Sequence, residues 1–297
     1  MSEHSHHSDY SDYSDEYFES GDGLRLHYRD YRPEGSTDDL PPVFCLAGLT
    51  RNCRDFEAIA RHLSRRLSPG RRVISPDLRG RGLSDHDPEW RNYHPLTYVR
   101  DMETLVDRLG FARIVCLGTS LGGLVSMTLN RRRPELVDRV ILNDVGPEIA
   151  PEGLARIMGY AGKTPDIRSW EDAVALSKAN YGVAYPDLTD EEWLAYARTG
   201  YREDAEGVPR LDCDPKIGDA LREVGGELED PWTLFAGLAD TPTLVIHGVL
   251  SDILTGDIVA KMREAKPDLK VLQVPNRGHV PMLNEPVCVR GIEAFLD

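Results

Sequence analysis

Short apolar runs that alternate with stretches of helical spacing constrain the fold of this chain more than any other feature. The runs are apolar at consecutive positions, as at residues 43–46, 114–117 and 140–142. Strands that are buried on both faces of a sheet have this pattern, and they occur mainly in parallel sheets between two layers of helices. The alternation therefore predicts an α/β fold with a mostly parallel sheet covered by helices on both faces.

Other segments extend the same pattern. Residues 24–31 alternate apolar and polar side chains, as a half-buried antiparallel strand does. Further strands are expected at 73–75, 243–246 and 271–274, and helices near 56–63, 98–109, 121–129, 258–265 and 287–296.

The alternation stops at Gly146–Pro147 and resumes at about residue 239. The segments in between have helical spacing, and no strand is expected among them. The sequence therefore predicts a helical cap at 147–238, inserted into a core formed by 17–146 and 239–297.

Polar side chains follow the predicted strands closely. Ser120, Asp252 and His279 each come soon after the end of one strand, and Asp144 comes soon after another. Ligands of open parallel sheets bind at the carboxyl ends of the strands, so these residues are candidates for a common site. Their order along the chain, Ser…Asp…His, is that of serine hydrolases with this architecture.

The stretch Gly118-Thr119-Ser120-Leu121-Gly122 places glycines two residues before and two residues after the serine. This spacing fits a sharp strand-to-helix turn that exposes the hydroxyl as a nucleophile. Serine is a poor nucleophile at neutral pH and needs a base within hydrogen-bond reach. His279 is the candidate base, because histidine can take up and return a proton near neutrality.

With these elements and the stretch Pro76–Asp85, which reads PDLRGRGLSD, the chain resembles the α/β-hydrolase fold family from Tyr17 to Asp297. The resemblance implies a capped serine hydrolase of the esterase type. It favours Asp252 as the acid that orients His279, because Gly248–Asp252 resembles the usual acid turn. Some family members place the acid after an earlier strand, which makes Asp144 the alternative; its structural role would be to bind loop amides.

The tetrahedral intermediate of ester hydrolysis needs two amide donors for its oxygen. One is expected from Leu121, directly after the nucleophile. The resemblance implies that the other comes from the loop Ala47–Thr50, and we assign it to the amide of Leu49. The family often has His-Gly where this chain has Ala47-Gly48.

Three further residues are candidates for the substrate pocket. Arg51 follows the oxyanion loop and would suit an acidic substrate, although a solvated or structural arginine is the more common case. Trp232 would form a pocket wall or pack in the interior. Val280 is next to the candidate base.

Composition excludes several classes of function. The net charge of −15 disfavours binding to nucleic acid or anionic membranes. No apolar run approaches the roughly 20 residues of a membrane span, and the N-terminus lacks the pattern of a signal peptide. The five cysteines have no metal-ligand spacing, so the cytoplasm is the expected compartment.

Residues 1–16 repeat Ser-Asp-Tyr and carry three histidines, and this composition predicts a disordered tail rather than a metal site. The sequence contains no P-loop, dinucleotide fingerprint or metal-ligand cluster, so no metal and no cofactor are expected.

The sequence thus predicts a hydrolase of carboxylic esters with short or medium acyl chains, acting through an acyl-enzyme. The expected partner is a small-molecule ester or lactone. Two alternatives stay open: an enol-lactone or lactone hydrolase with the same catalytic residues, and a non-catalytic ligand-binding scaffold of the same fold.

Overall fold

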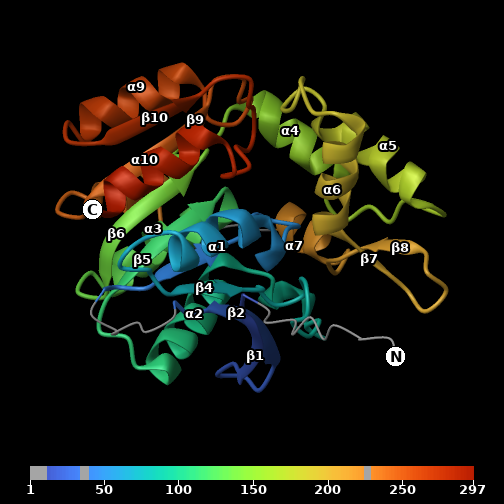
Figure 1. The fold of residues 1–297 in the computed structure, drawn as a ribbon, viewed down its shortest axis with the longest axis horizontal. Helices are drawn as coiled ribbons and strands as arrows, with labels where there is room; N and C mark the ends of the chain where they lie inside the picture. The colour runs from blue at the N-terminus through green and yellow to red at the C-terminus, as the bar shows by residue number, and fades with distance from the viewer. Residues whose placement is uncertain (1–11, 34–39, 224–228) are drawn as a thin grey trace, which may run out of the picture.

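The computed structural model describes residues 12–33, 40–223 and 229–297 (Figure 1). The described residues form an eight-stranded sheet in the order β1-β2-β4-β3-β5-β6-β9-β10. Strands β1 and β2 pair antiparallel, β2 pairs antiparallel with β4, and the remaining pairs are parallel. The strands are β1 (Ser14–Glu19), β2 (Arg25–Tyr31), β3 (Val43–Leu46), β4 (Val73–Pro76), β5 (Ile114–Thr119), β6 (Val137–Asn143), β9 (Thr243–Gly248) and β10 (Lys270–Val274).

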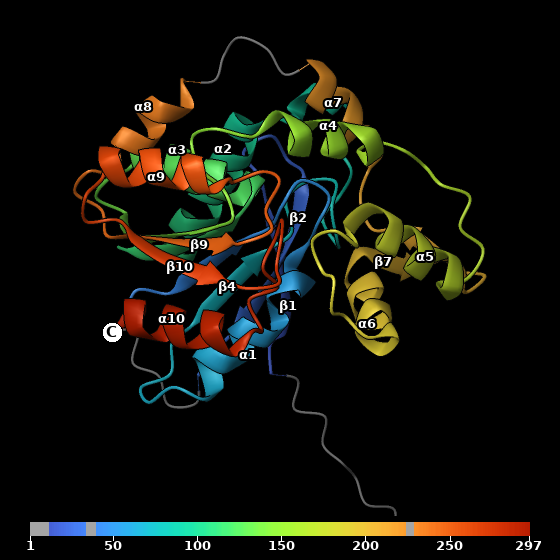
Figure 2. The ribbon, with the colours of Figure 1, turned by 90° about the horizontal axis from the view of Figure 1, so that it is seen from above.

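Helices cover both faces of this sheet (Figure 2). On one face lie α1 (Glu57–Arg65) and α10 (Pro286–Leu296), which share a buried apolar cluster with the sheet. On the other face lie α2 (Pro95–Leu109), α3 (Leu121–Arg132), α8 (Pro231–Ala236) and α9 (Gly256–Ala265). The consecutive apolar residues of the strands fill both clusters, so the predicted α/β fold with a mostly parallel, doubly covered sheet is confirmed.

Local sequence signals set the ends of helix α2. His94 accepts a hydrogen bond from the amide of Leu96, and Pro95 occupies the first turn, where its missing N–H costs nothing. Gly110 ends the helix in the left-handed conformation, with φ 70°. Glycine has no Cβ to oppose that conformation, which is why the predicted end at residue 109 agrees with the structure.

The inserted segment contains α4 (Pro151–Tyr160), α5 (Trp170–Tyr181), α6 (Asp190–Gly200) and α7 (Ile217–Glu223). In Figure 1, α4, α5 and α6 stand to one side of the sheet. We call these three the cap helices. Residues of all three helices line the cavity described below, together with residues of the core.

The structure differs from the sequence prediction at two points in the inserted segment. The inserted segment contains a hairpin of β7 (Tyr201–Glu203) and β8 (Pro209–Leu211), too short to give a strand signal in the sequence. Helix α8 falls inside the range predicted for the cap, but it packs on α3 in the core.

The N-terminal boundary also moves. Strand β1 begins at Ser14, within the range predicted to be a disordered tail, because its pairing with β2 fixes it. Residues 1–11 of that predicted tail lie outside the described part of the chain. Among the helices that the structure describes, none combines the length and apolar character needed to cross a membrane.

Candidate active site

Ser120 lies at the turn between β5 and α3, with φ 51° and ψ −116°. A Cβ at Gly118 would lie 2.3 Å from the carbonyl oxygen of Gly122, and one at Gly122 would lie 2.0 Å from the carbonyl oxygen of Leu46. Side chains at these two positions would prevent the turn from closing against itself and against β3. The flanking glycines are therefore needed for the backbone geometry that presents the hydroxyl of Ser120.

His279 follows β10 and bridges two side chains. Its Nε2 lies 3.0 Å from Oγ of Ser120, and its Nδ1 lies 2.9 Å from Oδ2 of Asp144. Asp144 follows β6, the strand next to β5 in the sheet. The sheet therefore brings Ser120, His279 and Asp144 into one hydrogen-bonded row.

Asp144 is fully buried, and each of its carboxylate oxygens is engaged. The amide of Gly248 donates to Oδ1 at 2.9 Å, and the hydroxyl of Ser251 donates to Oδ2 at 2.6 Å. The residue has φ 54°, a conformation that asparagine and aspartate adopt more readily than other non-glycine residues. The loop after β9 thus fixes the carboxylate that binds His279.

Asp252 was the favoured partner for His279, and the structure gives it a different one. Its carboxylate binds Arg156 of α4 in a bidentate pair, with Nε at 2.6 Å and Nη2 at 2.8 Å. Burial alone would raise the pKa of the Asp252 carboxyl, but the hydrogen bonds and charge of Arg156 outweigh it and lower that pKa. The predicted acid turn follows β9, but it is Ser251 of this turn that donates a hydrogen bond to Asp144. Asp252 pairs with Arg156 of helix α4 instead.

The two residues assigned as oxyanion donors lie near Ser120. Leu121 is the first residue of α3, where an amide has no partner within the helix. Within the described residues, the amide of Leu49 has no hydrogen-bond acceptor. A Cβ at Gly48 would lie 3.7 Å from Cβ of Ser120, so the loop passes close to the nucleophile.

Arg81, which the sequence analysis did not single out, holds this loop in place. The side chain is fully buried, and its Nε and Nη2 donate to the carbonyl oxygen of Leu49 at 2.9 and 2.8 Å. Its Nη1 donates to the carbonyl of Arg79 and to the hydroxyl of Tyr98. The buried guanidinium of Arg81 therefore fixes the carbonyl of Leu49, the residue assigned as an oxyanion donor.

A cavity of about 430 Å³ opens on this row of side chains. Of the predicted pocket residues, Arg51 and Val280 line it, together with Ser120, His279 and the assigned oxyanion residue Leu49. Trp232 is not among its lining residues. Trp232 lies on α8, which packs in the core, and its ring contacts Phe235. Its indole N–H donates to the carboxylate of Glu148.

The segment between α5 and α6 contacts the histidine loop on both sides of His279. The amide of Gly278 donates to the carbonyl of Ala184 at 2.8 Å, and the hydroxyl of Tyr185 donates to the carbonyl of Val280 at 2.7 Å. Tyr185 is buried, which raises the pKa of its phenol and keeps it a neutral donor. The inserted segment thus fixes the backbone that carries His279.

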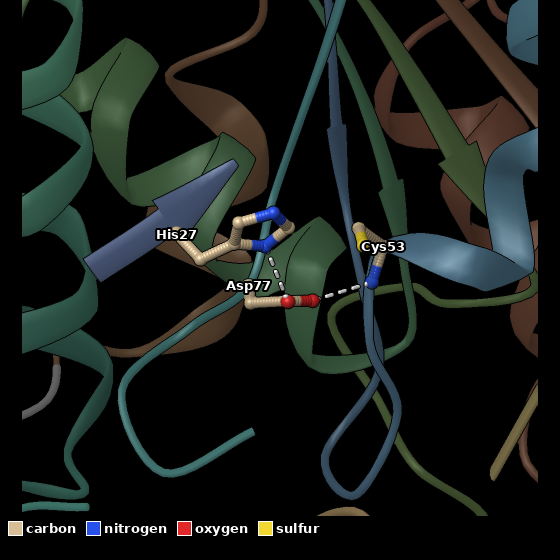
Figure 3. Close-up of side chains that lie close together, drawn as sticks. All are labelled: His27, Cys53 and Asp77. Carbon is tan, nitrogen blue, oxygen red and sulfur yellow. Dashed lines mark hydrogen bonds and ion pairs between the residues drawn. The ribbon is translucent and has the colours of Figure 1, made fainter. Parts of the chain in front are cut away.

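A second polar cluster lies away from this cavity, at His27, Cys53 and Asp77 (Figure 3). The carboxylate of Asp77 accepts from Nδ1 of His27 at 2.7 Å and from the amide of Cys53 at 2.7 Å. Nε2 of His27 lies 3.0 Å from the carboxylate of Asp15.

Each member of this cluster is therefore already engaged. Burial, reinforced by the charge of Asp77, raises the pKa of the Cys53 thiol well above its usual value, so the sulfur stays protonated. In that state the sulfur is not a nucleophile. The cluster ties β2, the loop after β4 and the turn before α1 together, and its members are too far apart in sequence to be recognised as a motif.

Comparisons with known proteins agree with this architecture. A family model described as alpha/beta hydrolase fold matches residues 41–286. A crystal structure of an alpha/beta hydrolase from Novosphingobium aromaticivorans is similar, with a TM-score of 0.88 and 40% sequence identity over 96% of this chain and 98% of that one.

Two curated relatives match over most of their length. The 3-hydroxybutyrate-oligomer hydrolase of Cupriavidus necator is 30% identical over 271 residues, which is 88% of this chain and 90% of the relative. The 2-(acetamidomethylene)succinate hydrolase of Mesorhizobium japonicum is 27% identical over 262 residues, which is 86% of this chain and 88% of the relative.

Proposed function

Because this chain belongs to the α/β-hydrolase fold family, we propose that it is a serine hydrolase that cleaves carboxylic esters with short or medium acyl chains through an acyl-enzyme. Ser120 is the nucleophile, His279 is the general base and acid, and Asp144 is the acid that orients the imidazole. The observation that carries the proposal is the row of hydrogen bonds from Oγ of Ser120 through His279 to Asp144, at 3.0 and 2.9 Å.

In the first half of the reaction, Oγ of Ser120 attacks the ester carbonyl while Nε2 of His279 takes its proton. The carbonyl oxygen becomes negative and is held by the amides of Leu49 and Leu121. The intermediate collapses when the bond to the leaving alcohol breaks, and the alkoxide takes the proton from His279. The acid part of the substrate stays on Ser120 as an ester.

In the second half, water attacks this acyl-enzyme and gives a proton to His279. Collapse of the second intermediate releases the carboxylic acid and returns the proton to Ser120. Throughout, the carboxylate of Asp144 accepts the Nδ1–H of His279 and so keeps Nε2 free to act as the base. Its negative charge also stabilises the imidazolium that forms in each half.

One of the two relatives supports the choice of ester as the scissile bond. An oligomer of 3-hydroxybutyrate is a chain of ester bonds that ends in a carboxylate, and the relative of that name is similar over most of both chains. The cavity volume of about 430 Å³ suits a small or medium ester. The cap helices stand over the site and would limit access for long acyl chains.

The proposal is tested with nitrophenyl butyrate and a fluorophosphonate that labels activated serines. Ser120→Ala is expected to lose kcat by about 10⁶-fold and to take up no label, because the triad acts as one unit. Ser14→Ala, at the exposed start of β1, is the matched control and is expected to keep both. Turnover by Ser120→Ala close to that of the unaltered protein would refute the mechanism, whereas unaltered protein that opens lactones but no open-chain ester would favour the lactonase alternative.

A further inference from the structure

We propose that Arg51 forms a binding site for a substrate carboxylate, so that the preferred ester carries a free carboxylate in addition to its scissile bond. This inference rests on the ester hydrolysis proposed above and adds the class of substrate.

Arg51 lies where two cavities meet. It lines the cavity that contains Ser120, and it also lines a second cavity of about 380 Å³ within the inserted segment. Thr50, Tyr160 and Tyr181 line both cavities as well. A substrate arm that leaves Ser120 toward the cap therefore meets the guanidinium at this junction.

One edge of the guanidinium is held and the other is open. Nε donates to Asp55 at 2.8 Å, and Nη2 binds both Asp55 and the hydroxyl of Thr199. The plane of the group lies over the ring of Tyr196, 4.7 Å from its centre. Among the described residues none accepts a hydrogen bond from Nη1, and this atom is not one of the fully buried polar atoms that lack a partner.

Gly200 makes room for this open edge. A Cβ at that position would lie 2.5 Å from Nη1 of Arg51, so any larger residue would press on the guanidinium. Gly200 itself lines the second cavity. Nη1 thus lies close to the backbone of Gly200, and both residues belong to the wall of the second cavity.

The chemistry of this edge selects an anion. A guanidinium only donates hydrogen bonds and does not lose its proton, and its planar shape matches a carboxylate. Burial raises the pKa of the phenols of Tyr160 and Tyr196, so these neighbours are neutral and do not compete as anions. The other acid of the first cavity, Glu57, is paired with Arg29 and Arg61.

The path from the nucleophile to Arg51 is clear of side chains at Gly48. A Cβ there would lie 3.7 Å from Cβ of Ser120 and 3.8 Å from Cγ of Arg51. Gly48 therefore lies between the two side chains and places no side chain of its own there. A carboxylate a few carbons from the scissile ester would reach the guanidinium while Ser120 attacks the carbonyl.

The experiment compares charged and neutral esters of equal length. Methylumbelliferyl hemiesters of dicarboxylic acids from succinate to suberate are paired with esters of the corresponding monocarboxylic acids. A second pair places the charge on the leaving group, as 3-acetoxybutyrate against 3-acetoxybutanamide. The unaltered protein is expected to prefer the charged member of at least one pair by about 10- to 100-fold in kcat/KM, as for a hydrogen-bonded charge pair. Which pair shows the preference tells whether the carboxylate belongs to the acid or to the alcohol.

Arg51→Gln is expected to lower this charged-to-neutral ratio by about 10- to 100-fold, and Arg51→Lys by less, because lysine keeps the charge but not the fork. Arg198→Gln, on the exposed side of α6 and against Trp170, is the matched control and should keep the ratio. Thermal unfolding and phosphonate labelling of each variant separate a lost site from a lost fold. If Arg51→Gln does not fold, the ratio in Arg51→Lys decides.

A ratio near one in the unaltered protein for every pair, or a high ratio that persists in the Arg51 variants, would overturn this proposal even if esters are cleaved. Free dicarboxylates, measured by calorimetry, give an independent readout. If no ester is cleaved but adipate or glutarate binds and Arg51→Gln abolishes that binding, the proposed function fails while the carboxylate site stands.

Discussion

Replacing Asp144 by asparagine tests the active-site assignment most directly, because the structure fixes how the new amide must lie. The amide of Gly248 donates to Oδ1 at 2.9 Å, so the carbonyl oxygen of the asparagine has to take that position. Its NH₂ group then replaces Oδ2 and points a donor at Nδ1 of His279, 2.9 Å away. His279 can only accept there, and its proton moves to Nε2, which faces Ser120.

In that tautomer the histidine cannot take the proton of Ser120. We expect Asp144→Asn to lower kcat by about 10⁴-fold, as measured for a triad aspartate in another serine hydrolase, which corresponds to about 5.5 kcal/mol of transition-state stabilisation. Oγ of Ser251 already accepts from the amides of Ile253 and Leu254, so its hydroxyl loses its acceptor at Oδ2. We expect this loss to cost about 1 kcal/mol of stability, which the fold should tolerate. Phosphonate labelling should slow to the same extent as turnover.

Asp252→Asn is the matched control, because the sequence alone favoured that residue. The change weakens a partly exposed ion pair with Arg156 and is expected to cost about 1 kcal/mol of stability or less. Its kcat for a nitrophenyl ester should change by less than about tenfold. If Asp252→Asn loses activity by three orders of magnitude while Asp144→Asn keeps it, the hydrogen-bonded row in this structure does not describe the working enzyme.

Two further substitutions probe what holds the site together. Gly122→Ala should destabilise the protein by about 3 kcal/mol in chemical denaturation, because its Cβ would lie 2.0 Å from a carbonyl oxygen of β3. Gly159→Ala is the control: a Cβ there has nothing within 4 Å, and stability should change by less than about 1 kcal/mol. Equal effects of the two substitutions would contradict the packing argument. Tyr185→Phe leaves the carbonyl of Val280 without its donor. It should lower kcat by about 3- to 10-fold and change KM by a smaller factor. A loss of stability with unaltered kcat would mean that Tyr185 only packs.

The sequence was sufficient for the sheet and for the serine and histidine of the site because both depend on local patterns. Consecutive apolar residues mark strands buried on both faces, and the glycines around Ser120 mark a turn that few other residues allow. The strand β3 was predicted with the bounds that the structure gives it, Val43–Leu46.

The choice between Asp144 and Asp252 could not be made from the sequence, because both residues follow strands at the same edge of the sheet. What separates them is the partner of each carboxylate. Arg156 lies in the inserted helices, far along the chain from Asp252, and its bidentate pair with that residue has no local signature. The sequence also does not show that the backbone of Asp144 has a positive φ.

The inserted segment makes several contacts with the loops of the core. Three of them reach the loops that also carry site residues: Arg156 binds the loop after β9, Tyr185 binds the loop after β10, and Thr199 binds the loop after β3 through Arg51 and through the side chain of Asn52. A displacement of the cap helices would therefore disturb three parts of the site: the loop that supports Asp144, the backbone of His279, and the guanidinium of Arg51, which we propose binds the substrate carboxylate.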